Sequence, residues 1–220
     1  MSVRFLGTAT AAAILFGVAS VTPVSAATYN FTQITDNGDL NVAANLQADV
    51  NLSASSAAFT FKWITSALGT IAQIYFDDDA NVLASMTCCT VSAGVSFAAN
   101  GSPPDLPAGN DVNPDFNADF RVSADSPAPS NGVDVLGEFV TVLFSIELGK
   151  TFADVIGALN GGTLRLGMHV ISINSPADGS ESLVNLTPVP VPAALLLFGS
   201  AIAWLGLLAR RRRQSVGVPA

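Results

Sequence analysis

The residues that could carry out chemistry are few, and they do not combine into a catalytic pattern. His169 is the only histidine of the 220-residue chain, and it lies on the polar face of a segment that alternates apolar and polar residues. A Ser-His-Asp or Cys-His site needs a nucleophile within reach of such a base, and the chain has no G-x-S-x-G pattern to present one. We therefore predict no catalytic residue and no enzymatic activity, and expect His169 to be an exposed or hydrogen-bonded strand residue.

Metal binding finds equally little support in the residue types. One histidine and the two adjacent cysteines, Cys88 and Cys89, cannot supply four zinc ligands in a usual spacing. Calcium prefers oxygen ligands, which residues 77–79 (Asp-Asp-Asp) and Asn81 could contribute, but the D-x-[DN]-x-[DN]-G loop is absent. We interpret this segment as a solvated hairpin loop, leave calcium open, and predict neither a metal site nor a cofactor.

The cysteines and the acidic residues leave several alternatives open. A bridge between the neighbours Cys88 and Cys89 would close a small, strained ring, while two buried thiols or pairing with another molecule are equally compatible with the sequence. Glycoside hydrolysis needs two carboxyl groups, but among 17 acidic residues some pair can always be found, so this signal has almost no specificity.

The charge of the chain is distributed unevenly. Charged residues make up 12% of the sequence and hydrophobic residues 50%, whereas an ordinary soluble domain is about 25% charged. All 17 acidic residues fall between Asp36 and Glu181, and only four basic residues lie among them. This central region repels phosphate-rich surfaces, which excludes nucleic acid as a partner. The apolar excess belongs to the two ends.

The N-terminus has the pattern of a secretory signal peptide. Arg4 supplies a positive charge, residues 6–18 form a soft apolar run, and small residues follow up to Ala26 and Ala27. These are the three parts of a cleaved export signal. We expect cleavage after Ala26 or Ala27, with the signal peptide covering residues 1–27.

The C-terminus has the pattern of a membrane anchor. Residues 191–209 carry no charge, and as a helix they would span about 28 Å, close to the thickness of the hydrocarbon layer. Arginines follow at once and favour a cytoplasmic end: Arg210, Arg211, Arg212 and Arg213. The sequence therefore predicts one transmembrane helix, with the preceding region outside the membrane.

A proline motif stands directly before this helix: Val189, Pro190, Val191, Pro192 and Ala193. Motif, apolar helix and arginine cluster together resemble the sorting domain of the PEP-CTERM superfamily in its VPLPA-CTERM variety, with valine in place of the family's leucine at the third position. The resemblance implies processing near the motif by an exosortase, a membrane-embedded cysteine transpeptidase of Gram-negative bacteria. It also implies an association with exopolysaccharide and biofilm systems.

The resemblance divides the chain into four parts. We expect a signal peptide over residues 1–27, an outer domain over 28–187, a sorting domain over 188–214 and a short tail over 215–220. The precursor would be anchored in the inner membrane, and the processed protein would reach the cell surface or the extracellular matrix. Its expected partners are the exosortase, the membrane before processing, and an extracellular polysaccharide as a further candidate.

The outer domain shows the patterns of short strands. Residues 59–64, 70–76, 94–97, 116–122, 139–148 and 163–173 are rich in apolar, aromatic or alternating residues, and polar turn clusters separate them. One helix is predicted over residues 151–160, where Thr151 and Asp154 form a capping box and Gly161 supplies the stop. We predict an all-β domain, a single β-sandwich of jelly-roll type with one short helix.

The outer domain, roughly residues 57–185, also resembles domains that often precede such sorting tails. Shared features include an Ile-Tyr-Phe-Asp-Asp stretch at residues 74–78 and a Gly-Ser-Glu-Ser-Leu-Val-Asn ending at residues 179–185. These domains have no generally assigned activity. The first hypothesis is therefore a structural or adhesive protein of a polysaccharide matrix.

Two alternatives remain. A carbohydrate-binding module would present exposed aromatic side chains on one face, or a site in the loop over residues 100–113. A matrix hydrolase would need a cleft with two carboxylates about 5–9 Å apart.

Overall fold

The structure, a computed structural model, describes residues 26–37, 40–173 and 179–185. The expected sorting motif, transmembrane helix and arginine cluster lie outside these residues, as does nearly all of the expected signal peptide. None of the helices within the described ranges is long and apolar enough to span a membrane.

The described residues form ten β-strands, two α-helices and two short 3-10 turns. The strands are β1 Ala27–Gln33, β2 Leu46–Ser53, β3 Ser56–Trp63, β4 Thr70–Asp77, β5 Leu83–Val91, β6 Phe97–Ala99, β7 Phe120–Ala124, β8 Phe139–Ile146, β9 Arg165–Ile173 and β10 Gly179–Asn185. The helices are α1 Ala128–Asn131 and α2 Phe152–Gly161, and the 3-10 turns are η1 Ala43–Asn45 and η2 Gly109–Asp111.

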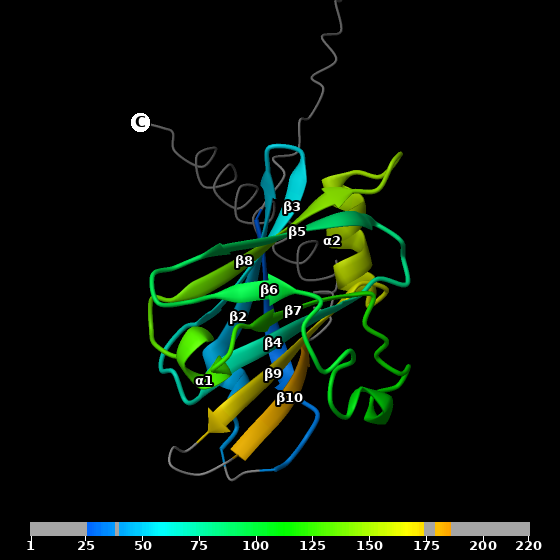
Figure 1. Cartoon of the computed structure of the whole chain (residues 1–220). Coiled ribbons are helices and arrows are strands. Elements are labelled where there is room, and N and C mark those ends of the chain that lie inside the picture. Colours follow the sequence, from blue (N-terminus) through cyan, green and yellow to red (C-terminus); the bar gives the residue numbers. More distant parts are fainter. Residues whose placement is uncertain (1–25, 38–39, 174–178, 186–220) are drawn as a thin grey trace, which may run out of the picture.

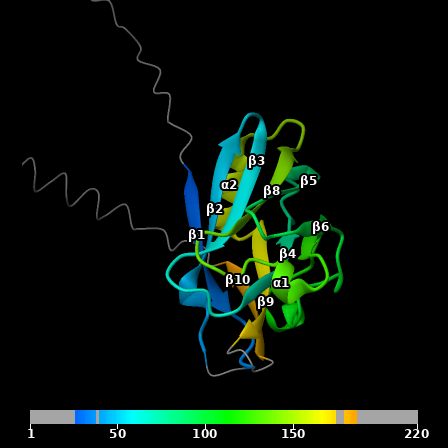
Figure 2. The same ribbon diagram turned by 60° about the vertical axis from the view of Figure 1, so that its left-hand side comes forward.

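The strands pair antiparallel in the order β5-β8-β3-β2-β1-β10-β9-β4-β7-β6 (Figure 1). Strand β1 belongs to both halves of this sheet, since residues 27–30 pair with β2 and residues 31–33 pair with β10. Figure 2 shows β1 beside the long β2–β3 hairpin. At the opposite ends of the order, Cys88 Sγ in β5 lies 3.8 Å from the carbonyl oxygen of Phe97 in β6, so the sheet nearly closes on itself like a barrel.

The core is built from the alternating faces of these strands. Phe59 and Phe61 of β3 meet Phe76 of β4 and Phe144 of β8, all fully buried. Their rings pack edge to face with centroids 4.7–5.9 Å apart. Such tilted pairs add about 0.5–1.5 kcal/mol each beyond the burial of area. The prediction of an all-β domain with alternating core strands is confirmed.

The predicted helix forms as α2 and connects the two halves of the sheet. The Thr151 side chain accepts a hydrogen bond from the Asp154 N–H, and the Asp154 carboxylate accepts one from the Thr151 N–H at 2.7 Å, which is the predicted capping box. The stop differs by one residue: Gly161 is the last helical residue, and Gly162 takes the left-handed conformation with φ of 73°. Only glycine adopts that conformation without steric cost.

A second helix, α1, was not expected, because its segment has the composition of a turn. It is a single turn of four residues after Pro127. Pro129 stands in its first turn, where the missing N–H would have had no partner in the helix. The prediction of a single helix is therefore wrong, because the described residues contain this second, short helix.

The predicted strand over residues 116–122 is also wrong in its first half, since β7 begins at Phe120. Phe116 lies instead in the long loop between β6 and β7, drawn in green on the right of Figure 1. It packs with Leu106 of the same loop against Tyr75 and Val184 and forms a small second core on the outer face of the sheet. Gly167 permits this close approach, because a Cβ there would lie 2.9 Å from the Phe116 ring.

Candidate functional site

A pocket of about 360 Å³ lies where the long loop meets the ends of β9 and β10. We call it the Arg165 pocket. Its floor and walls come from β1, the loop, the end of α2, β9 and β10: Thr32, Ile34, Val112, Asn113, Pro114, Gly161, Gly162, Arg165, Val184 and Asn185. The described residues of this lining include one arginine and no acidic residue.

Arg165 begins strand β9 and is 6% exposed. Its guanidinium donates to the carbonyl oxygens of Pro114 at 2.6 Å and Asp115 at 2.5 Å, and it forms an ion pair with Asp77. The Arg165 Cζ also lies 5.3 Å from the centre of the Phe116 ring. One side chain thus ties the loop over residues 113–117 to the neighbouring strands β4 and β9.

Asp77 completes this arrangement at the end of β4. Its carboxylate is 1% exposed and accepts a hydrogen bond from the Asn117 N–H at 3.0 Å as well as from Arg165. Burial raises the pKa of Asp77, while the Asn117 N–H and the charge of Arg165 oppose that rise. The pair brings no net charge to the pocket.

Two buried hydrogen-bond donors, Arg165 Nε and Asn185 Nδ2, have no partner among the residues that the structure describes. Asn185 is fixed by its other side-chain atom, because Oδ1 accepts the Leu166 N–H at 2.7 Å. A buried donor without an acceptor lowers the stability of the fold by about 1–3 kcal/mol, so these two atoms are unfavourable features of the folded domain.

The segment over residues 77–79 is not the solvated hairpin loop that the sequence suggested. Asp78 is 5% exposed, and its carboxylate accepts the N–H groups of Val82 at 2.9 Å and Leu83 at 2.7 Å. With Asp77 bound to Arg165, two of the three carboxylates already have protein partners. In the part of the chain that the structure describes, no three His, Cys, Asp or Glu side chains gather as a metal site requires.

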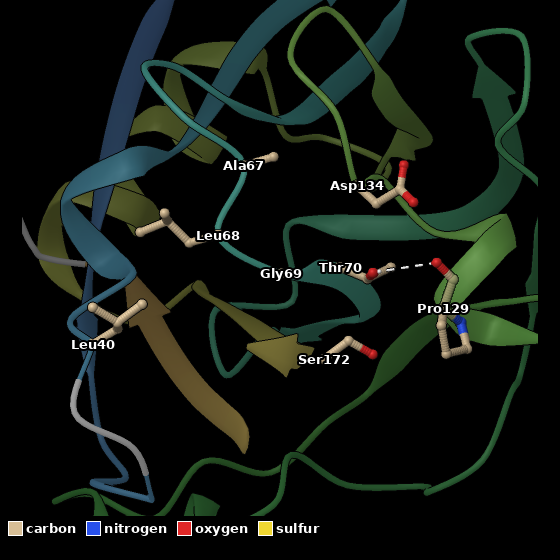
Figure 3. Close-up of a pocket in the computed structure, with 8 residues that line it drawn as sticks. All are labelled: Leu40, Ala67, Leu68, Gly69, Thr70, Pro129, Asp134 and Ser172. Atoms are coloured by element: carbon tan, nitrogen blue, oxygen red, sulfur yellow. Dashed lines mark hydrogen bonds between the residues drawn. The ribbon is translucent and has the colours of Figure 1, made fainter. Parts of the chain in front are cut away.

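A larger pocket of about 470 Å³ opens near the start of β4 (Figure 3). Thr70 Oγ1 donates to the Pro129 carbonyl oxygen at 3.3 Å, and Asp134 is the one acidic residue among the described residues of the lining. Burial and the charge of Glu138 raise the pKa of Asp134. Glu138 does not line the pocket, and its carboxylate accepts the N–H groups of Asp134 and Val135. Among the residues that the structure describes, the lining therefore does not include the two facing carboxylates of a glycosidase.

His169 lies half-buried on β9, and its Nδ1 is 2.6 Å from Gln73 Oε1 on the neighbouring strand β4. Burial lowers the pKa of His169. The hydrogen-bonded strand residue that the sequence suggested is confirmed.

Cys88 and Cys89 form a disulfide with each other, which settles the three alternatives in favour of the intramolecular bridge. The bridge lies in β5, where the pairing with β8 breaks register between Thr87 and Thr90. It marks the outer edge of the sheet beside β6.

Aromatic side chains are absent from the exposed residues of the described ranges. Phe97, Phe120 and Phe139 are half-buried, and the remaining aromatic residues there are buried. The large apolar side chains that do reach the surface are aliphatic: Leu52, Ile64, Val135, Leu136 and Leu148. The domain therefore offers no exposed ring on which a sugar could stack.

Of the site residues predicted from the sequence, the structure describes only those of the signal-peptide cleavage site. Ala26 and Ala27 are described, and Ala27 is the first residue of β1, where it pairs with Val50. The motif of residues 189–193 and the arginines of residues 210–213 lie outside the described residues. Sequence reasoning missed Arg165, although a single arginine between Leu164 and Leu166 in an apolar strand is an available signal.

Comparison of the chain with protein-family models, with curated proteins and with solved structures gave no match.

Proposed function

We propose that this chain is an exported surface or extracellular-matrix protein, sorted through its C-terminus by an exosortase and structural or adhesive in an exopolysaccharide matrix. The C-terminal pattern supports export and sorting, because a proline motif, an uncharged run and four arginines follow one another in the order of PEP-CTERM sorting domains. The single observation that supports the structural role is the burial of the aromatic side chains, which serve the core instead of a binding face.

The fold proposal is the jelly-roll type of sandwich. Its support is the nested pairing of the central strands: β3 pairs with β8, β4 pairs with β7, and β5 lies beside β6. Three consecutive strands thus meet the next three in reverse order, as in a long hairpin wrapped around a core. The chain then extends each half through β1, β2, β9 and β10.

A non-enzymatic role is the better supported alternative. The described residues that line the pocket of Figure 3 include one carboxyl group, that of Asp134, and the acidic side chains Asp77 and Asp78 are held by protein donors. Glycan recognition is the second candidate, and its support is the Arg165 pocket beside the predicted loop over residues 100–113.

The test of sorting is mass spectrometry of the protein from the envelope and medium of its native host. We expect a mature species that begins at Ala27 or Thr28 and ends near residues 189–193, and we expect that species to vanish when the exosortase is deleted. Replacing both Pro190 and Pro192 by alanine should have the same effect, because alanine does not restrict the backbone of its neighbour as proline does.

Pro188→Ala, just outside the motif, is the matched control and should leave processing intact. A species that retains Arg210 to Arg213 in the membrane of both the parent and the deletion strain would refute the sorting proposal. The tail would then be an ordinary anchor.

A further inference from the structure

The last strand of the domain points toward the end of the sheet that carries the β2–β3 hairpin turn. Asn185, the last residue of β10, pairs antiparallel with Phe31, so β10 runs toward Ala27 at the start of β1. Ala27 pairs with Val50, and β2 then continues to Ser53 at the turn of the hairpin. The hairpin therefore projects beyond Asn185 in the direction in which β10 points.

The link from this strand to the expected membrane helix is short. Residues 186–190 separate Asn185 from the uncharged run that begins at residue 191, and even fully extended this link reaches only about 20 Å. Along four residue steps of β1 and three of β2, the hairpin turn at Ser53 lies about 23 Å beyond Asn185. A link that continues in the direction of β10 therefore brings the hairpin turn to the membrane surface.

The turn between β8 and α2 lies at the same end of the domain. Ser53 pairs with Ser56, and Ser56 pairs with Ser145, so the last residues of β8 are level with the hairpin turn. The chain then turns at once, and the Lys150 N–H donates to the Glu147 carbonyl oxygen at 2.9 Å. Figures 1 and 2 show the β2–β3 hairpin and this turn at one end of the domain.

Each of these two turns exposes a leucine side chain. Leu52, directly before the hairpin turn, is 44% exposed, and Leu148, in the turn after β8, is 95% exposed. An exposed leucine gains nothing from water, whereas it is stabilised at the boundary between lipid headgroups and acyl chains. Two leucines on neighbouring turns, at the end that the short link holds near the membrane, therefore fit a lipid surface.

The charges beside the leucines decide the kind of lipid. Lys150 stands in the turn, Glu147 precedes it, and Asp154 follows in the first turn of α2. This small surplus of negative charge would be repelled by anionic headgroups. The contact must therefore be apolar, and a zwitterionic bilayer is the surface that suits it.

We propose that the turns over residues 52–55 and 147–150 lie against a zwitterionic phospholipid surface, with Leu52 and Leu148 inserted and the link over residues 186–190 holding them there. This inference rests on the anchored precursor of the proposed function. It gives the anchored domain one orientation, in which the loop before β8 faces away from the membrane.

Two tryptophan variants compare the two ends of β8. Leu148→Trp places an indole after the end of this strand, and Leu136→Trp places one in the loop before its start. Leu136 is 52% exposed, so it is a matched control position on another exposed loop. Both variants also carry Trp204→Phe, which removes the tryptophan of the expected membrane helix, while the buried Trp63 contributes a constant background.

The full-length variants are reconstituted into phosphatidylcholine vesicles with and without bromine atoms on the acyl chains, because bromine quenches an indole that it touches. Insertion of one leucine-sized side chain favours the contact by about tenfold or more. We therefore expect brominated lipid to remove more than about half of the Leu148→Trp signal and to leave the Leu136→Trp signal unchanged. Adding anionic phosphatidylglycerol should not strengthen the quenching.

A longer link tests what holds the turns at the surface. Inserting about twelve Gly and Ser residues after residue 187 makes the link flexible and lowers the effective concentration of the turns at the bilayer, so quenching of Leu148→Trp should fall at least about twofold. The same insertion after residue 214, behind the arginines, is the control and should leave the quenching unchanged.

Circular dichroism establishes that each variant is folded, and flotation with the vesicles after carbonate washing establishes that it is anchored. The inference is overturned if the anchored Leu148→Trp variant is not quenched, if Leu136→Trp is quenched as strongly, or if quenching requires phosphatidylglycerol. Quenching that the longer link does not reduce would overturn it as well. A chain that does not float refutes the anchor and the contact together, whereas a chain that floats without quenching refutes the contact alone.

Discussion

Replacing Arg165 by methionine removes the guanidinium but keeps most of the side-chain volume. The Asp77 carboxylate, 1% exposed, then keeps a single protein donor, the Asn117 N–H. The carbonyl oxygens of Pro114 and Asp115 also lose their donor. Removing one partner of a buried ion pair leaves an uncompensated charge, so we expect the free energy of unfolding to fall by about 3–5 kcal/mol.

The chain provides a matched control in its exposed ion pair. Lys62 Nζ lies 2.5 Å from Asp49 Oδ2, and the two side chains are 35% and 24% exposed. Exposed pairs of this kind contribute about 0.2–1 kcal/mol, so Lys62→Met should change stability by no more than that. A large difference between the two variants measures the effect of burial.

The loss should also depend on pH. Burial raises the pKa of Asp77, and the charge of Arg165 opposes that rise. Removing Arg165 should therefore raise the pKa of Asp77 in the folded protein further above its value in the unfolded chain, about 3.9. Between these two values the folded state binds the proton and the unfolded state does not. Stability therefore falls as pH rises through this window, and Arg165→Met should be less impaired at pH 4 than at pH 7.

Urea unfolding followed by the fluorescence of Trp63 measures these effects. Trp63 is buried and its indole N–H donates to the Val133 carbonyl oxygen at 2.9 Å, while Trp204, the other tryptophan, is replaced by phenylalanine in all samples. The double variant Asp77→Asn/Arg165→Met should recover part of the loss, because no charge is left unpaired. A loss below 1 kcal/mol, or one that does not change with pH, would refute the reasoning.

Three further predictions follow from single contacts. Phe59→Ala should lower the free energy of unfolding by about 3–5 kcal/mol in urea titrations, because it leaves a cavity beside the rings of Phe76 and Phe144; a loss below 1 kcal/mol would contradict that packing. Thr151→Ala should cost about 1 kcal/mol in thermal unfolding by circular dichroism, whereas Thr151→Ser should cost much less since it keeps the cap. Iodoacetamide should not label Cys88 or Cys89 in the unfolded chain until a reductant is added, and labelling without reductant would exclude the disulfide.

Alternation within a single strand was enough to predict β3 and β9, whereas the central strands β1 and β2 were not predicted. In β9 the buried residues Leu166, Met168 and Val170 are two positions apart, and this periodicity appears in the sequence itself. The cap of α2 is equally local, since Thr151 and Asp154 are three residues apart. Both signals act over distances shorter than one element.

Strand β10 was not predicted, because its burial depends on distant partners. Glu181 is fully buried, and its carboxylate accepts the Thr35 hydroxyl and the Asn37 N–H, both more than 140 residues away in sequence. Polar residues of this kind resemble a turn until their partners are known. Strand β5 was missed for another reason: it is an edge strand, and most of its residues are half-buried or exposed.

The Arg165 pocket shows the same limit for a site. The ion pair joins positions 88 residues apart, and the guanidinium of Arg165 reaches the carbonyl oxygens of Pro114 and Asp115 only once the loop lies against the strand ends. Arg165 uses its charge to hold Asp77 and the loop, and none of these partners is its neighbour in the sequence. The variant that removes Arg165 should therefore lose the anchoring of the loop over residues 113–117 together with the ion pair.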